Sequence, residues 1–292
     1  MKLANLRGRA VLVLDDGLVD IDEASGGEFG PAVHGVLNDW DCFVAWCDGA
    51  RHQWSAVSVA EPVFDAVVPR PGQVFAVGLN YRAHAIEAGL PIPEVPLVFT
   101  KFPSSIAAPQ GDLELPTDQV DWEVELALVV GREARKVSQD QAWSHVAGVT
   151  AAQDFSARDV QLLGGAKPQF SLGKSFESFT PLGPVLVTPD EYDDPDAIEV
   201  SCAINGETVQ SSSTADLIFP VSAIVSYLSH IVTLRPGDVI LTGTPSGVGL
   251  GMTPPRYLVP GDEVTTYVAG VGRMTHVCRA PEHAFDAVAL LA

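Results

Sequence analysis

The chain has 292 residues, 47% of them apolar and 18% charged, so it can bury one large core with a small additional unit and does not have the composition of a disordered chain. Asp and Glu outnumber Lys and Arg by 37 to 17, and the formal charge of −20 excludes sequence-independent binding to nucleic acid phosphates. A small anionic substrate would need a local positive charge to overcome this long-range field.

The cysteines are scattered, without the spacing of a zinc site or a disulfide framework: Cys42, Cys47, Cys202 and Cys278. They predict reduced thiols in a cytoplasmic protein. The first residues lead only to a short apolar segment at 11–14, and no apolar run approaches the length of a membrane span. We therefore expect neither export nor membrane insertion.

Residues 1–70 predict a small N-terminal α+β domain of short strands and one helix, with Asp15-Asp16-Gly17 as a hairpin turn. Residues 71–292 predict a second, catalytic domain. Short apolar segments separated by Gly and Pro turns begin at Gln73, and this texture favours a β-rich sandwich or roll over a Rossmann sheet. The whole chain is thus expected to be an α+β, β-rich protein, with helices in the second domain at residues 81–88, 139–146 and 220–229.

Two carboxylates lie inside the segment 120–131, which otherwise reads as a buried strand. Because side chains alternate along a strand, Glu123 and Glu125 share one face with Ala127 and Val129. Two buried like charges repel each other and lose hydration unless protons or a cation compensate them. A metal site and a solvated strand face remain equally open from this segment alone.

Asp154 ends another apolar stretch, which begins at Val146. It is either a cap for the following turn or a ligand. Together with Glu123 and Glu125 it would complete three oxygen donors, the hard set that selects Mg²⁺ or Mn²⁺, with Ca²⁺ as a further candidate. Three protein ligands leave part of an octahedral shell open for substrate oxygens.

A short helix is expected after the strand that ends at Gly78, with Asn80 as its N-cap. His84 and Glu87 are three residues apart on it, so the carboxylate can orient the imidazole and raise its basicity, as a general base requires. A surface salt bridge would have the same spacing.

Two further segments carry groups suited to an anionic ligand. Lys174 follows Gly173 in apolar surroundings, and the glycine-rich loop 241–249 contains Gly243 and the hydroxyl of Thr244. The loop lacks the lysine of a phosphate-binding loop and the helix start of a dinucleotide site. Close backbone approach to a small anion and a plain tight turn are both open.

These pieces, in this order, resemble the fumarylacetoacetate hydrolase family, including its acylpyruvate hydrolases and 2-hydroxyhepta-2,4-diene-1,7-dioate isomerases. The resemblance covers about residues 71–272 and is carried by five motifs: Gly78-Leu79-Asn80-Tyr81 with His84 and Glu87; Asp121-Trp122-Glu123-Val124-Glu125-Leu126; Asp154 with Ala157-Arg158-Asp159 and Gln161; Gly173-Lys174-Ser175-Phe176; and Thr242-Gly243-Thr244-Pro245 with Gly247-Val248-Gly249.

The resemblance implies a mixed β-sandwich roll, usually dimeric, and a divalent cation held by the residues matching Glu123, Glu125 and Asp154. It also implies a His84 and Glu87 dyad on a mobile lid. Contacts with substrate or water are implied for four positions: Arg158, Gln161, Lys174 and Thr244. Gly243 in the same loop and Arg82, which would add to a local positive well, complete the candidate substrate-binding residues.

The first functional hypothesis is a metal-dependent hydrolase that cleaves the C–C bond of a β-diketo acid such as an acylpyruvate. The cation would chelate the 2-oxo acid end and stabilise the departing enolate, while His84 deprotonates the attacking water and Lys174 orients it. The alternative is an oxaloacetate decarboxylase or a hydroxydienoate isomerase that uses the same metal site. A third hypothesis is a protein of this fold that binds a ligand without turnover.

Overall fold

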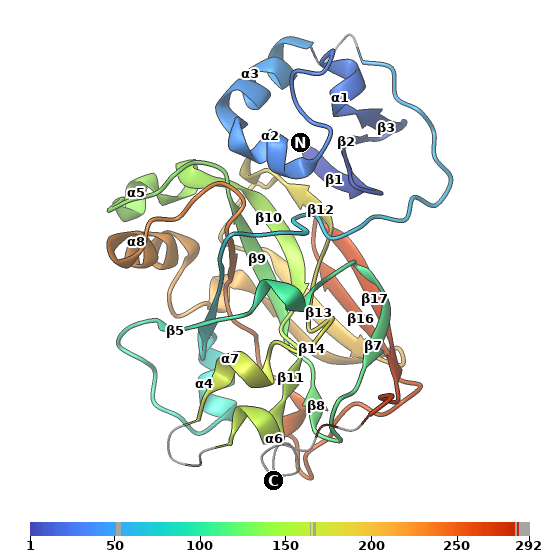
Figure 1. Cartoon of the computed structure of the whole chain (residues 1–292). Coiled ribbons are helices and arrows are strands. Elements are labelled where there is room, and N and C mark those ends of the chain that lie inside the picture. The colour runs from blue at the N-terminus through green and yellow to red at the C-terminus, as the bar shows by residue number, and fades with distance from the viewer. Residues whose placement is uncertain (51–53, 164, 166–167, 284, 286–292) are drawn as a thin grey trace.

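The computed structural model describes residues 1–50, 54–163, 165, 168–283 and 285. Its N-terminal unit, at the top of Figure 1, contains three strands and three helical segments: β1 (Lys2–Leu6), β2 (Arg9–Leu14), β3 (Gly17–Asp20), α1 (Ile21–Ala24), α2 (Val33–Asn38) and α3 (Trp40–Ala50). Asp15 and Asp16 form the predicted hairpin turn between β2 and β3. The prediction of one helix was wrong, because α1 and α2 are too short to show a helical period in the sequence.

The N-terminal unit extends the main sheet, because β1 pairs antiparallel with β12 (Thr180–Val187). Its own core is aromatic. Trp40, Phe43 and Cys47 lie three and four residues apart on α3 and pack inward, with Phe29 against Phe43 edge to face. A division of the chain at residue 70 stays a prediction.

The main sheet has ten strands in the order β3-β2-β1-β12-β10-β9-β15-β4-β5, with β6 also pairing with β12. The remaining strands of this sheet are β4 (Val74–Gly78), β5 (Leu97–Thr100), β6 (Ile106–Ala107), β9 (Val124–Val130), β10 (Val146–Gln153) and β15 (Val239–Leu241). Every residue of β9 and β10 is buried, as expected of strands covered on both faces. These two strands form the centre of the molecule (Figure 1).

A second sheet of five strands covers one face of the first, in the order β14-β13-β16-β17-β7. Its strands are β7 (Gln110–Glu114), β13 (Glu199–Ile204), β14 (Glu207–Ser213), β16 (Glu263–Val268) and β17 (Gly272–Arg279). Buried and more exposed residues alternate along β13, β16 and β17, so one face packs into the core that both sheets share. A short pair, β8 (Val120–Asp121) with β11 (Ser156–Ala157), lies beside them. The predicted strand-rich mixed fold is confirmed.

The three helices predicted for residues 71–292 are present. They are α4 (Arg82–Glu87), α5 (Gln139–Ala142) with a 3₁₀ turn at Trp143–His145, and α8 (Val221–Ile231). Two short helices that the sequence did not predict, α6 (Arg158–Gln161) and α7 (Phe170–Gly173), lie with α4 at the lower end of Figure 1. Further 3₁₀ turns are Pro103–Ser105, Pro189–Glu191, Thr214–Asp216 and Gly249–Gly251. None of the helices in the described part of the chain is long and apolar enough to cross a bilayer.

Asn80 is not the N-cap of α4, which corrects the prediction. Tyr81 occupies that position and makes no side-chain capping bond. The Asn80 amide instead donates to the backbone oxygens of Phe219 and Thr242 and accepts from Phe219 N. This buried amide therefore joins the start of α4 to the loop that follows β15.

Candidate active site

The register of β9 and β10 brings three carboxylates to one place. Glu125 is opposite Ala152 in this antiparallel pair, and Asp154 N donates to Glu123 O at 2.9 Å just beyond the strand ends. Residues opposite each other in antiparallel strands project from the same face, as do residues two apart on one strand. Glu123, Glu125 and Asp154 therefore converge, and one carboxylate oxygen of each lies within 4.8 Å of the others.

The predicted face of the acidic strand is buried. Trp122, Val124 and Leu126 pack in the core between the two sheets, while Ala127 and Val129 pack in the core on the other side. Glu123, Glu125 and Asp154 are only 6%, 2% and 0% exposed. The sequence left open whether this strand face is solvated, and the structure shows that it is buried.

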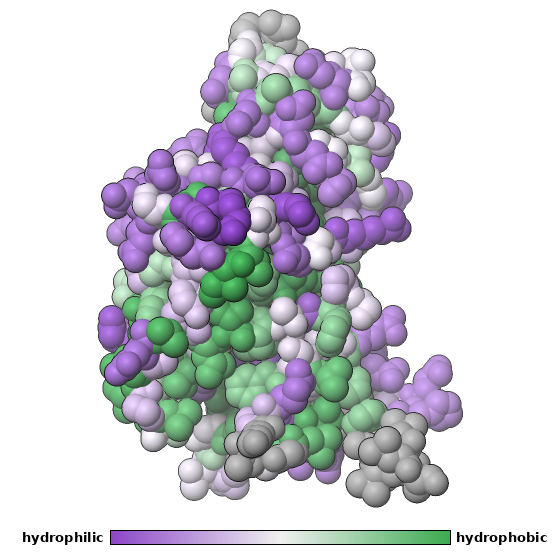
Figure 2. Space-filling view, turned by 60° about the vertical axis from the view of Figure 1, so that its left-hand side comes forward, coloured by the Kyte–Doolittle hydropathy of each residue, from purple (hydrophilic) through white to green (hydrophobic). Residues whose placement is uncertain are grey.

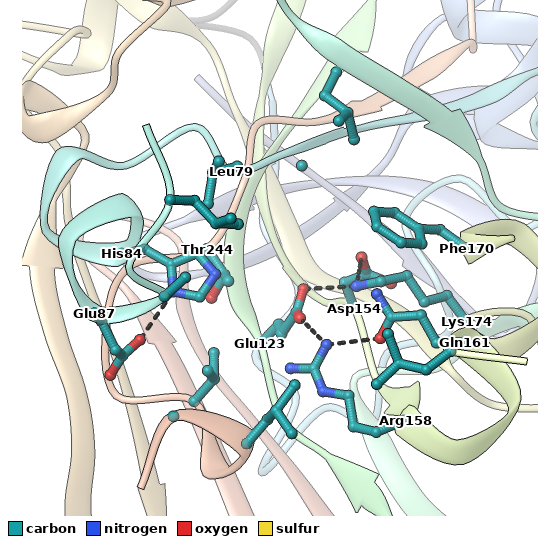
Figure 3. Close-up of a pocket in the computed structure, with 18 of the residues that line it drawn as sticks. Leu79, His84, Glu87, Glu123, Asp154, Arg158, Gln161, Phe170, Lys174 and Thr244 are labelled. Carbon is teal, nitrogen blue, oxygen red and sulfur yellow. Dashed lines mark hydrogen bonds and ion pairs between the residues drawn. The ribbon is translucent and has the colours of Figure 1, made fainter. Parts of the chain in front are cut away.

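Two lysines and one arginine surround the carboxylates. Lys174 Nζ lies 2.7 Å from both Glu123 Oε2 and Asp154 Oδ2. Arg158 Nη1 lies 2.7 Å from Glu123 Oε1, and Lys101 Nζ pairs with the other oxygen of Asp154 and donates to Phe179 O at 3.0 Å. Figure 3 shows Lys174, Glu123 and Arg158 meeting at the base of a pocket.

Burial and the neighbouring charges shift the pKa values of Glu123 and Glu125 in opposite directions. Burial raises the pKa of Glu123, but the Lys174 and Arg158 charges overcome it and lower that pKa to about 2. Burial and the charges of Asp154 and Glu123 raise the pKa of Glu125 well above its usual value. Burial lowers the pKa of Lys101. Glu125 is thus the least compensated member of the three.

The donor set fits a hard divalent cation. All three ligand candidates offer carboxylate oxygen, they are buried, and their mutual repulsion is what a bound cation would relieve. With Asp121 included, four carboxylates face three cationic side chains, so with all seven groups ionised a dication would turn the local charge from negative to positive. That change would favour an anionic substrate inside an acidic protein.

The His84 and Glu87 pair is formed on α4. His84 Nδ1 lies 2.9 Å from Glu87 Oε2, and Glu87 Oε1 accepts from Gly247 N at 2.8 Å. The same carboxylate therefore orients the imidazole and ties α4 to the glycine-rich loop. A Cβ at Gly251 would lie 2.8 Å from Glu87 Cδ, so a larger residue there would displace the Glu87 side chain from this position.

The glycine-rich loop also closes over the acidic strand. Gly243 N donates to Glu125 Oε2 at 2.6 Å, and Gly243 has φ +107°, with room for a Cβ blocked by Asn80. Thr244 Oγ1 accepts from Gln210 Nε2 at 2.9 Å, so its own hydrogen can point to a ligand. Gly243 thus supports a carboxylate of the triad, while Thr244 faces the pocket.

Most of the predicted site residues line one cavity of about 580 Å³: His84, Glu87, Glu123, Glu125, Asp154, Arg158, Gln161, Lys174 and Thr244. Gly243 is not among the lining residues, but its N–H binds Glu125, which is. Arg82 is exposed and outside the lining residues, so the fold does not bring it to the others. The roles given to all of these residues stay predictions.

Sequence analysis missed two buried charges. Asp121, in the motif beside Glu123, binds Arg158 at 2.7 Å and accepts from the backbone of Gly249 and Leu250. Lys101 directly follows the strand β5 and reaches Asp154. In both cases the available signal was a charged residue beside an apolar segment. The sequence pattern does not indicate which residue it would pair with.

Both the sequence and the structure of this chain match known proteins. Residues 73–279 match the family described as Fumarylacetoacetate (FAA) hydrolase C-terminal. Over 215 residues the chain is 46% identical to Homo sapiens oxaloacetate tautomerase FAHD2A, mitochondrial, which covers 73% of this chain and 68% of that protein. A solved structure of a protein given the name HpcE, from Mycobacterium smegmatis, matches at a TM-score of 0.92 and 52% identity, over 96% of this chain and 99% of that one.

A second solved structure bears on the cation. Maleylpyruvate hydrolase from Sphingobium sp. SYK-6, in complex with manganese(II) ion and pyruvate, has a TM-score of 0.80 and 26% identity, over 97% of this chain and 100% of that one. Two sheets around a buried acidic cavity and these matches define one class of protein. The chain belongs to the fumarylacetoacetate hydrolase family, which confirms the resemblance, and its named relatives are enzymes.

Proposed function

We propose that this protein is a divalent-metal-dependent enzyme that interconverts the enol and keto forms of a small 2-oxo acid. The observation that carries the proposal is that the His84 and Glu87 pair lines the same cavity as the buried carboxylate triad. One acid–base group beside a cation site is sufficient for proton transfer next to an oxo group. The 46% identity with an oxaloacetate tautomerase supports this order of preference over the hydrolysis favoured by the sequence alone.

His84 is the proton-transfer residue in this proposal. Because Glu87 accepts the hydrogen on Nδ1, the lone pair is on Nε2. Nε2 removes a proton from the carbon next to the oxo group and returns it to the oxygen, or the reverse, and Glu87 stabilises the imidazolium between the two transfers. The step needs no attacking water.

The charged end of the cavity binds the 2-oxo acid group. Thr244 donates its hydroxyl hydrogen to a substrate oxygen, and Lys174 and Arg158 hold Glu123 in place. A divalent cation bound by the carboxylate triad, Mg²⁺ or Mn²⁺, would supply Lewis-acid withdrawal of electrons from the oxo group. Charge that develops on the substrate oxygen then lies toward the positive side of the site.

C–C bond hydrolysis of an acylpyruvate is the second candidate, and the likeness to maleylpyruvate hydrolase supports it. There His84 would deprotonate a water instead of a carbon. Decarboxylation of oxaloacetate or isomerisation of a hydroxydienoate would use the same residues. Homodimerisation also stays a prediction, which sedimentation of the purified chain would test.

The test follows ketonisation of the enol forms of oxaloacetate and phenylpyruvate by loss of enol absorbance, with Mg²⁺ or Mn²⁺ added. We expect acceleration over buffer, lost in Glu125→Gln and kept in Glu133→Gln, a matched change at an exposed glutamate. No acceleration, or full rate in Glu125→Gln, would contradict the proposal. Two acids released from an acylpyruvate, without enol ketonisation, would favour the second candidate.

A further inference from the structure

The cavity has two chemically different ends. The charged side chains gather at its base, around Glu123 and Asp154, whereas much of the remaining lining, the far wall of the cavity, is apolar: Leu79, Leu97, Phe99, Leu162, Phe170 and Leu250. The Phe99 and Phe170 rings pack edge to face at 5.6 Å, and Lys174 Nζ lies 5.2 Å from the Phe99 centroid. The boundary between the two ends is therefore at Lys174.

Apolar surface continues from this wall to the outside. Leu97, Leu162 and Leu250 are 45%, 47% and 38% exposed although they line the cavity. Figure 2 shows apolar side chains gathered over the lower half of this face, which in Figure 1 carries α4, α6 and α7. A substrate that fills the cavity would cover side chains that otherwise contact water.

The cationic side chains of the cavity are paired with the carboxylates at its base. Among the described lining residues, the permanently cationic side chains are Arg158 and Lys174, and the ionisable imidazole of His84 is bound to Glu87. Arg158 contacts Asp121 and Glu123, and Lys174 contacts Glu123 and Asp154. The base can take one carboxylate and oxo group, but a second carboxylate placed against the far wall would give up part of its hydration without gaining a cationic partner in this part of the structure.

We propose that the site selects 2-oxo acids whose far end is apolar and discriminates against those that end in a second carboxylate. This inference rests on the proposed function for the identity of the head group. It separates the chain from a relative named for oxaloacetate, which has two carboxylates. The protein's charge of −20 acts in the same direction, because it repels a dianion more than a monoanion.

Calorimetric binding to the Mg²⁺-loaded protein tests the inference without turnover. The matched pair is 5-methyl-2-oxohexanoate and 2-oxoglutarate, which differ by an isopropyl group in place of the terminal carboxylate. We expect the apolar acid to bind at least tenfold more tightly. Along the series from 2-oxobutanoate to 2-oxohexanoate we expect about a fourfold gain for each methylene.

A variant pair locates the effect. Leu97→Arg places a cation at the far wall and should shift the ratio of the two dissociation constants at least tenfold toward 2-oxoglutarate. Leu172→Arg, on α7 and 60% exposed but outside the cavity, should leave the ratio unchanged. Leu162→Arg carries the same test where Leu97→Arg does not fold.

The outcomes separate this inference from the proposed function. Selective binding without enol ketonisation supports the inference and contradicts the function. Ketonisation together with equal or tighter binding of 2-oxoglutarate overturns the inference and leaves the function. If neither acid binds, or if Leu97→Arg and Leu162→Arg fold without shifting the ratio, the inference is overturned.

Discussion

The base of the cavity and the helix that faces it are built in opposite ways. The base consists of buried carboxylates, one on β9 and two directly beyond the ends of β9 and β10, which are joined to Lys101, Lys174 and Arg158. The facing pair is on α4, a helix of six residues whose His84 and Glu87 side chains are 15% and 20% exposed. The comparison teaches that the charge of the site is held at the centre of the main sheet, whereas the proposed proton-transfer group is placed on a short and more exposed helix.

Breaking the base should have the largest effect. Asp154→Ala removes one proposed cation ligand and leaves Lys101 and Lys174 buried with one partner fewer. Because an uncompensated buried charge is costly, we expect a loss of about 3–5 kcal/mol in the free energy of unfolding, together with loss of Mg²⁺ binding. Denaturant unfolding and calorimetry measure the two. Asp118→Ala, at an exposed aspartate, should change neither; an unchanged unfolding free energy in Asp154→Ala would contradict the description of the base.

Removing the proton-transfer group should affect rate but not stability. For His84→Ala we expect turnover to fall by about 10²- to 10⁴-fold, the range for loss of a general acid–base, while the melting temperature stays close to that of the unchanged protein. Ile86→Ala, on the same helix and 79% exposed, is the matched control. Wild-type turnover in His84→Ala on every substrate of the parent would make the assignment wrong.

Two substitutions of Glu87 separate its contact with His84 from its contact with Gly247. Glu87→Gln can keep an oxygen for Gly247 N, but its amide nitrogen would donate to His84 Nδ1 and move the hydrogen of the imidazole to Nε2. We expect at least about a tenfold loss of rate with unchanged stability. Glu87→Ala should also lose about 1 kcal/mol of stability, because the loop contact disappears. Equal stability of both variants would show that this contact does not hold the helix.

The smallest effect concerns the packing behind the base. His276 on β17 is 1% exposed, bonds Ala108 O through Nε2 at 3.1 Å and faces the Phe155 ring. Burial lowers the pKa of His276, and the hydrogen bond only partly offsets it. The folded state then binds fewer protons than the unfolded state, so this contribution is present above the unfolded pKa of about 6.5 and is lost as the pH falls below it.

Unfolding of the wild type and of His276→Gln between pH 7.5 and 5.5 measures this term. The wild type should lose up to about 1.4 kcal/mol per pH unit more than the variant below pH 6.5. Parallel pH profiles would mean that His276 does not contribute.

The alternation of side chains decided what the sequence could predict about the base. A strand period of two places Glu123 and Glu125 on one face whatever the fold, and apolar neighbours around them indicate burial. The hairpin at Asp15-Asp16-Gly17 and the strand-rich second domain were predicted from turn residues between apolar segments. Short helices such as α6 and α7 have one turn each, too little for a helical period, and were not predicted.

The sequence alone therefore determined the acidic strand, the strand-rich architecture and the family, because these depend on local periodicity and on ordered motifs. Only the tertiary structure decided that Asp154 is opposite Glu123, that Lys101 and Asp121 belong to the site and that Arg82 does not. Those facts depend on strand register and on contacts between residues 20 to 129 positions apart. Contacts between residues so far apart in the chain produce no periodic pattern in the sequence, so the sequence does not predict them.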